Sequence, residues 1–209
     1  MIAIINYGAG NLTSVKLALD ALKAESVITS SPSDILSATH IVFPGVGAIG
    51  SAMQKLANLK IIPAIQEAIN KGIPFLGICL GTQIILKESE EDGGVKGLGL
   101  IDGMVKRFIP QSHWDKIPQI GWNTVQFIRE HCIFNDIENN SEFYFVHSYY
   151  PVPLLNDNVM AITEYAGTRF ASIIASKNII ATQFHPEKSG RIGIKLIKNF
   201  LAWDGKSLC

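Results

Sequence analysis

The stretch FLGICLGTQ, residues 75–83, decides the fold, because it leads from a short apolar run directly into a thiol and then into a helical segment. Apolar runs of this length, bounded by turn signals, are typical of strands that are buried on both faces. Cys79 ends the run, and Gly77 and Gly81 on either side leave room for the strand and the helix to cross. The segment predicts a nucleophile elbow, a strained turn that presents one side chain at the end of a strand. A buried structural cysteine is the alternative interpretation.

The first half of the chain alternates strands and helices in the same way. Apolar runs predict four strands, at residues 2–5, 27–28, 41–43 and 75–78. Apolar residues at helical spacing lie between them; Ile62, Ile65 and Ile69, for example, form one stripe. Strand and helix units of this length imply a mostly parallel sheet with helices on both faces.

The second half contains far fewer helical patterns. Six further runs predict strands, at residues 104–109, 125–128, 143–147, 160–165, 170–176 and 179–184. They suggest antiparallel strands that extend the parallel core, before a last amphipathic helix over residues 192–201. No repeat, low-complexity tract or flexible linker divides the chain, so we expect one α/β domain over residues 1–209.

Charge and composition exclude several classes of protein. The chain has 18 basic and 18 acidic residues, so it lacks the basic excess that phosphate backbones require, and we expect no nucleic acid partner. No window approaches roughly 18 consecutive apolar residues and no signal peptide begins the chain, so we expect no membrane association and a cytoplasmic location. Three cysteines cannot form a paired framework, which predicts reduced thiols. The acidic run at residues 88–92 is interpreted as a solvated turn.

A histidine and a carboxylate follow the last predicted strand, in His185-Pro186-Glu187. If this strand lies beside the elbow strand, His185 can take the thiol proton and Glu187 can fix the tautomer of the ring. Catalytic groups in open α/β sheets lie outside the carboxyl ends of the strands, as both segments do. Together with Cys79 they predict a Cys-His-Glu triad, whereas an exposed loop is the alternative.

The loop PGVG, residues 44–47, also follows a predicted strand. Glycines on both sides of Val46 allow its backbone N–H to be presented to a ligand, and the N–H of Leu80 follows the nucleophile. The two N–H groups predict an oxyanion hole. Taken alone, the loop is only a turn.

The remaining motifs carry no cofactor or metal. The glycine-rich loop at residues 8–10 suggests a dinucleotide site, but Thr13 stands where the third glycine is needed, so NAD is not expected. His113, His131 and Cys132 lack the spacing of metal ligands. The sequence therefore predicts no cofactor and no metal centre.

Taken together, FLGICLGTQ, PGVG and FHPEKS resemble the class I glutamine amidotransferases, which hydrolyse glutamine through a cysteinyl thioester and release ammonia for a second active site. NYGAGN (residues 6–11), KIPQIGWN (116–123) and FYFVHSYY (143–150) resemble a narrower family, the glutaminase subunits of imidazole glycerol phosphate synthases. The resemblance covers essentially the whole chain and implies a flavodoxin-like core.

The resemblance also implies roles for individual residues. The triad would be Cys79, His185 and Glu187. Binding of the oxyanion and of the amino-acid end of glutamine would fall to Gly45, Val46, Leu80, Gln83, His147, Ser148 and Tyr149. Docking of a (β/α)₈-barrel cyclase subunit, which uses the ammonia in histidine biosynthesis, would involve Trp122, Tyr144 and Lys188.

Three other functions stay open on the sequence alone. A paralogous subunit would supply ammonia for amidino-sugar synthesis, and neither the triad nor Gln119, where some relatives carry histidine, distinguishes it. A stand-alone hydrolase with a cysteine elbow would be active without a partner. A binding subunit that kept only the scaffold would have an unreactive Cys79.

Overall fold

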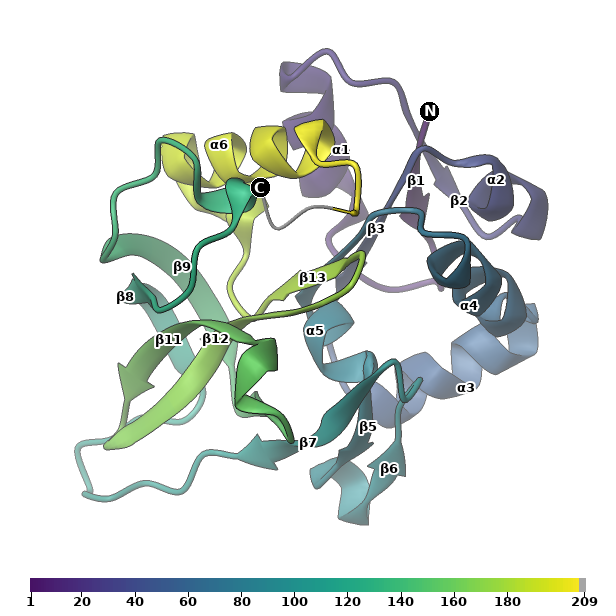
Figure 1. The fold of residues 1–209 in the computed structure, drawn as a ribbon. Helices are drawn as coiled ribbons and strands as arrows, with labels where there is room; N and C mark the ends of the chain where they lie inside the picture. Colours follow the sequence, from purple (N-terminus) through teal and green to yellow (C-terminus); the bar gives the residue numbers. More distant parts are fainter. Residues whose placement is uncertain (207–209) are drawn as a thin grey trace.

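The computed structural model describes residues 1–206, and two sheets organise it (Figure 1). The larger sheet has nine strands in the order β2-β1-β3-β4-β13-β12-β11-β8-β9. In that order their bounds are Ser26–Thr29, Ile2–Ile5, His40–Gly45, Phe75–Cys79, Ile179–Thr182, Thr168–Ser176, Val159–Tyr165, Gln119–Phe127 and Ser141–His147. The smaller sheet has the order β10-β7-β5-β6, with the bounds Tyr149–Pro153, Ile101–Arg107, Leu86–Ser89 and Val95–Lys96.

In this part of the chain, six α-helices and four short 3₁₀ segments connect the strands. The helices α1 to α6 span Leu12–Ala21, Pro32–Ser37, Ile49–Leu59, Ile62–Asn70, Leu80–Ile84 and Gly190–Ala202. The 3₁₀ segments η1 to η4 span Glu91–Gly93, Cys132–Phe134, Asn156–Asn158 and Pro186–Lys188.

The large sheet is parallel in one half and antiparallel in the other. Strands β2, β1, β3, β4 and β13 pair in parallel, and β12, β11, β8 and β9 continue the sheet with antiparallel pairings. This arrangement confirms the predicted α/β class with an antiparallel extension of the parallel core. Parallel pairing follows from the helical crossovers between the first strands.

Apolar residues on both faces of the parallel strands build the core. Along β1, Ala3 and Ile5 join the cluster under α2, α3 and α4, whereas Ile2 and Ile4 join the cluster under α1 and α6. Each strand is therefore buried on both sides, which explains why its sequence is apolar without alternation. The helices lie on both sides of the sheet in Figure 1.

The carboxyl ends of three neighbouring strands bring the predicted motifs together. Gly45 at the end of β3 pairs with Cys79 at the end of β4. On the other side of β4, Thr182 at the end of β13 pairs with Ile78. Residues that are about a hundred positions apart in the sequence thus meet at one edge of the sheet, as the topology of a parallel sheet requires.

The small sheet corrects the sequence-based expectation. The strand predicted at residues 104–109 belongs to this separate sheet, and β5, β6 and β10 were not predicted at all. Both outer residues of β5 are buried while its two middle residues, Lys87 and Glu88, are exposed, a pattern without period-2 alternation. Prolines 151 and 153 argue against a strand, but β10 lies at a sheet edge, where proline is tolerated.

The cysteines and the helices bear on two expectations drawn from the composition, reduced thiols and the absence of a membrane-spanning segment. Cys132 is disulfide-bonded, so the expectation of reduced thiols is wrong for this residue, whereas Cys79 is a free thiol. Cys209 lies outside the described residues. Within residues 1–206, none of the helices combines the length and the apolar character needed to span a membrane.

Candidate active site

A strained backbone presents Cys79 at the end of β4. Its φ of 55° and ψ of −102° lie outside the regions that non-glycine residues usually adopt. A Cβ atom at Gly81 would lie 2.0 Å from the backbone oxygen of Phe43, and one at Gly77 would lie 2.8 Å from the backbone oxygen of Gly81. The close crossing of α5 over β3 and β4 therefore requires both glycines, and the predicted elbow is present.

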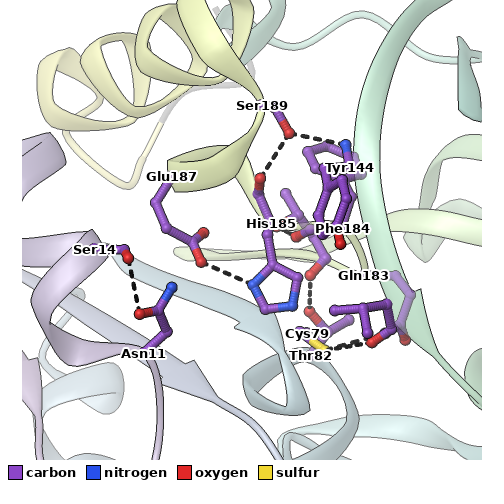
Figure 2. Close-up of polar contacts among 12 residues, drawn as sticks. Asn11, Ser14, Cys79, Thr82, Tyr144, Gln183, Phe184, His185, Glu187 and Ser189 are labelled. Carbon is purple, nitrogen blue, oxygen red and sulfur yellow. Dashed lines mark hydrogen bonds and ion pairs between the residues drawn. The ribbon is translucent and has the colours of Figure 1, made fainter. Parts of the chain in front are cut away.

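His185 lies in the connection between β13 and η4 and forms a buried pair with Glu187 of η4 (Figure 2). The Nδ1 atom of His185 lies 2.8 Å from Oε1 of Glu187, and the two side chains are 1% and 0% exposed. The loop is tied to the antiparallel strands, because the N–H of His185 donates to the backbone oxygen of Tyr144 and the Ser189 hydroxyl donates to the backbone oxygen of His185. These bonds fix the imidazole in one orientation.

Charge around the imidazole favours its protonated form. Burial lowers the pKa of His185, but the neighbouring Cys79 and Glu187 outweigh burial and raise it to about 10. The Nε2 atom interacts with the Cys79 side chain, yet no group within residues 1–206 meets hydrogen-bond geometry with it. The thiol and the imidazole are thus neighbours rather than a formed hydrogen bond, and a protonated His185 beside the sulfur favours the thiolate.

A cavity of about 250 Å³ opens onto Cys79. Its lining consists of Val46, Gly47, Cys79, Leu80, Gln83, Glu91, Val146, His147, Ser148 and Tyr149. Six of the seven residues expected to bind oxyanion or substrate are among them. Gly45 is absent from the lining because it pairs with Cys79 inside the sheet and packs against Leu80.

Polar side chains in this lining mostly bond to the protein itself. The Gln83 amide donates to the backbone oxygen of Tyr149 at 3.0 Å, and Nδ1 of His147 lies 2.7 Å from the same oxygen. Burial lowers the pKa of His147 to about 4, so this ring is neutral at neutral pH. Because the carbonyl can only accept, the proton of His147 lies on Nδ1. Gln83 and His147 therefore shape the wall of the cavity.

Glu91 belongs to the cavity although the sequence placed it in a solvated turn. Its Oε2 accepts a hydrogen bond of 2.7 Å from the backbone N–H of Ile49, the first residue of α3. Burial raises the pKa of Glu91, and the charge of Asp92 raises it further. The interpretation as a solvated turn is thus wrong for this residue. Only the contact with a helix 42 residues away reveals it, and no local pattern could have done so.

The three residues expected to face a partner lie together beside the triad loop. Trp122 on β8 is 54% exposed, and its ring is 6.1 Å from that of Tyr144 on β9. The ammonium group of Lys188 lies 5.9 Å from the centre of the Tyr144 ring. Ile120 on β8 is also exposed, at 64%. Large exposed apolar side chains in one place are typical of protein interfaces.

Two known proteins with similar sequences carry the same name. A relative from Methanocaldococcus jannaschii, "Imidazole glycerol phosphate synthase subunit HisH", is 48% identical and covers 96% of this chain and 98% of its own length. A relative of the same name from Chlorobaculum tepidum is 47% identical with the same coverage.

Solved structures with lower sequence identity share the fold. The structure of PurLQS from Thermotoga maritima has a TM-score of 0.73 at 19% identity, covering 96% of this chain and 97% of that one. A crystal structure described as glutamine amidotransferase has a TM-score of 0.72 at 16% identity, with 97% and 98% coverage. The family model described as glutamine amidotransferase class-I matches residues 3–203. The chain therefore belongs to the class I glutamine amidotransferases.

Proposed function

We propose that this chain is the glutaminase subunit of an imidazole glycerol phosphate synthase, which takes ammonia from glutamine and supplies it to a second subunit for histidine biosynthesis. The buried His185 and Glu187 pair beside the strained Cys79 is the observation that carries the proposal. The names of relatives that are 45% to 48% identical over nearly the full length support the choice of synthase.

The triad accounts for the hydrolysis of the amide. The Cys79 thiolate attacks the side-chain amide carbon of glutamine, and a tetrahedral intermediate with a negatively charged oxygen forms. His185 gives the proton on Nε2 to the leaving nitrogen, so that ammonia departs and a thioester remains. Water then attacks the thioester while His185 accepts one of its protons, and the second tetrahedral intermediate expels the thiolate. The released carboxylic acid loses its remaining proton to solvent and leaves as glutamate. Glu187 keeps the ring oriented and stabilises its positive charge throughout.

Backbone N–H groups stabilise the negatively charged oxygen of both intermediates. The N–H of Leu80 follows the nucleophile, and that of Val46 belongs to a second loop that lines the same cavity. Removing one such donor costs about a factor of 10² to 10³ in rate. The position of the Val46 peptide is therefore sufficient to switch the enzyme on or off. We expect it to become competent when the partner is docked and loaded with its ligand.

Glu91 is the group best suited to hold the amino group of the substrate. Its carboxylate lines the cavity that opens onto Cys79, and one oxygen is already fixed by the N–H of Ile49. A positively charged α-ammonium group entering the cavity would form a charge-assisted hydrogen bond with this carboxylate. Ser148 and Tyr149 line the same cavity, where Ser148 and the backbone around Tyr149 can contact the α-carboxylate.

The partner subunit docks on the exposed face around Trp122, Tyr144 and Lys188. By the family resemblance this partner is a (β/α)₈-barrel cyclase, and its docking would cover the exposed Trp122 and Ile120. We further propose that residues 1–209 form one amidotransferase domain in the cytoplasm. The family match over residues 3–203 and a large sheet that draws strands from both halves of the chain support this organisation.

Substitution of the nucleophile tests the proposed function. The complex of this chain with the cyclase subunit should make imidazole glycerol phosphate from either glutamine or added ammonium salt. Cys79→Ala should abolish synthesis with glutamine and leave synthesis with ammonium unchanged, since only the second reaction bypasses the thioester. Equal synthesis from glutamine by Cys79→Ala and the unaltered chain would contradict the proposal.

A further inference from the structure

We propose that Gln183 is a further residue of the active site, whose side-chain amide donates an N–H to the Cys79 sulfur and stabilises its thiolate form. The inference rests on the proposed function, in which that thiolate is the nucleophile. Gln183 lies between β13 and His185, and its Nε2 atom is 3.8 Å from Sγ of Cys79. Figure 2 shows the Gln183 side chain beside Cys79, on the strand connection that leads to His185.

The hydrogen bonds of neighbouring groups settle which end of the Gln183 amide faces the sulfur. The Gln83 amide nitrogen donates one hydrogen to the backbone oxygen of Tyr149 at 3.0 Å. A backbone carbonyl can only accept, so this end of Gln83 is its nitrogen. The second hydrogen of that nitrogen is directed to Oε1 of Gln183 at 3.1 Å. The oxygen of Gln183 is therefore occupied as an acceptor, and its nitrogen must face Cys79.

Burial makes this donor effective. Gln183 is completely buried and Gln83 is almost so. Water cannot replace the N–H that faces the sulfur, and a buried amide without partners would be costly. The backbone around Gln183 is also held, because its N–H donates to the backbone oxygen of Ser172 and the Thr82 hydroxyl donates to the backbone oxygen of Thr182. The amide nitrogen is thus fixed beside the sulfur before substrate arrives.

The sulfur lies between groups that favour opposite protonation states. The backbone oxygen of Val146, also 3.8 Å from Sγ, can accept a hydrogen bond from the thiol but is unfavourable beside a thiolate. The Gln183 N–H favours the thiolate, because a donor to an anion is stronger than a donor to a neutral group. His185 acts in the same direction through its positive charge. Gln183 therefore offsets the effect of the Val146 carbonyl.

The other charged groups that act on Cys79 are not bonded to Gln183. Tyr7 and His185 interact directly with the Cys79 charge. Glu187 and His147 act on it through His185. None of these four side chains is hydrogen-bonded to the Gln183 side chain, whose described bonds go to Gln83 and Cys79. We therefore expect these four groups to keep their contacts when Gln183 is changed, so that a change in the behaviour of the thiol reports on the Gln183 amide and its bond to Gln83.

The test is the rate at which iodoacetamide alkylates Cys79 as a function of pH, measured on the full chain by mass spectrometry of the Cys79 peptide. Gln183→Met keeps an unbranched side chain of similar length but removes the donor. We call the pH at which the alkylation rate is half its maximum the midpoint. We expect the midpoint of Gln183→Met to rise by about one pH unit, which makes alkylation about tenfold slower below the midpoint. Gln183→Glu directs an anionic oxygen at the sulfur and should raise the midpoint at least as far.

Thr163→Val is the matched control, because it removes a buried hydroxyl that donates to the backbone oxygen of Thr124 on the antiparallel strands. It should leave the midpoint unchanged. Wild-type midpoints in both Gln183→Met and Gln183→Glu would overturn the inference, and so would equal shifts in the Thr163→Val control. If one Gln183 variant fails to fold, the other decides the outcome by the same criterion.

The alkylation assay and the synthase assay can fail independently. Alkylation requires neither glutamine nor a partner subunit, so a midpoint shift would persist even if the complex made no imidazole glycerol phosphate. Conversely, glutamine-dependent synthesis that requires Cys79, together with unshifted alkylation in the Gln183 variants, would remove only the role of Gln183.

Discussion

Glu187→Gln isolates the contribution of the third member of the triad. The change keeps the size of the side chain but replaces the carboxylate that lies 2.8 Å from Nδ1 of His185. Both side chains are buried, so solvent does not screen the bond. A hydrogen bond to a charged group contributes roughly 1.5–3 kcal/mol, which corresponds to about a 10- to 150-fold loss of kcat if the bond is fully effective when His185 is positively charged.

The same substitution changes the pH dependence in a defined direction. His185 has a pKa raised from 6.5 to about 10, so it stabilises the folded chain below about pH 6.5, and this stabilisation is lost as the pH rises toward 10. Without the Glu187 charge the pKa of His185 falls. Both the alkaline decline of glutaminase activity and the loss of unfolding free energy should then begin at lower pH.

The measurements are kcat for glutamine hydrolysis by the loaded complex from pH 6 to 10, together with urea unfolding of the chain at each pH. Glu67→Gln is the control, since it alters only an exposed ion pair between Glu67 on α4 and Lys71 just after that helix, and exposed pairs contribute little. A kcat within twofold of the unaltered enzyme and an unchanged pH profile in Glu187→Gln would refute the role assigned to Glu187.

Three further substitutions test separate parts of the structure. Gly81→Ala places a Cβ 2.0 Å from the Phe43 oxygen and should lower the unfolding free energy by about 1–3 kcal/mol or more. Gly50→Ala is the control and should not lower it, because the nearest atom to its Cβ is a side-chain atom at 3.3 Å. Equal urea midpoints for the two variants would contradict this prediction. Glu91→Gln should raise KM for glutamine at least tenfold with a smaller change in kcat, in steady-state assays of the complex; an unchanged KM would remove Glu91 from the substrate site. Trp122→Ala should weaken binding of the partner subunit by 2 kcal/mol or more, about 30-fold in Kd by calorimetry, while the fold by circular dichroism stays intact; unaltered affinity would place the interface elsewhere.

The central sheet could be predicted because its strands are buried on both faces. The run from Phe75 to Ile78 is apolar without interruption, and the glycines around Cys79 mark a sharp turn whatever the rest of the chain does. The pairing of His185 with Glu187 was also accessible, since the two residues are close in sequence and follow a strand that ends at the same edge. Local sequence therefore determines these features.

The features that could not be predicted depend on contacts between distant segments. Glu91 acquires its role only because η1 lies against the start of α3. Gln183 interrupts an apolar run, but only the bonds to Gln83 and Cys79 show what the amide does. In the small sheet only β7 was predicted as a strand. The short strands β5 and β6 and the proline-containing edge strand β10 each resemble a loop when taken alone.

The reactivity of Cys79 toward a glutamine-like diazo ketone tests the central claim most directly. The loaded complex should be labelled once per chain at Cys79, glutamine should protect it, and His185→Ala should slow the labelling strongly because the thiolate loses its cationic neighbour. Labelling at another residue, or equal rates in the His185→Ala variant and the unaltered complex, would contradict the claim that Cys79 and His185 act together as nucleophile and base.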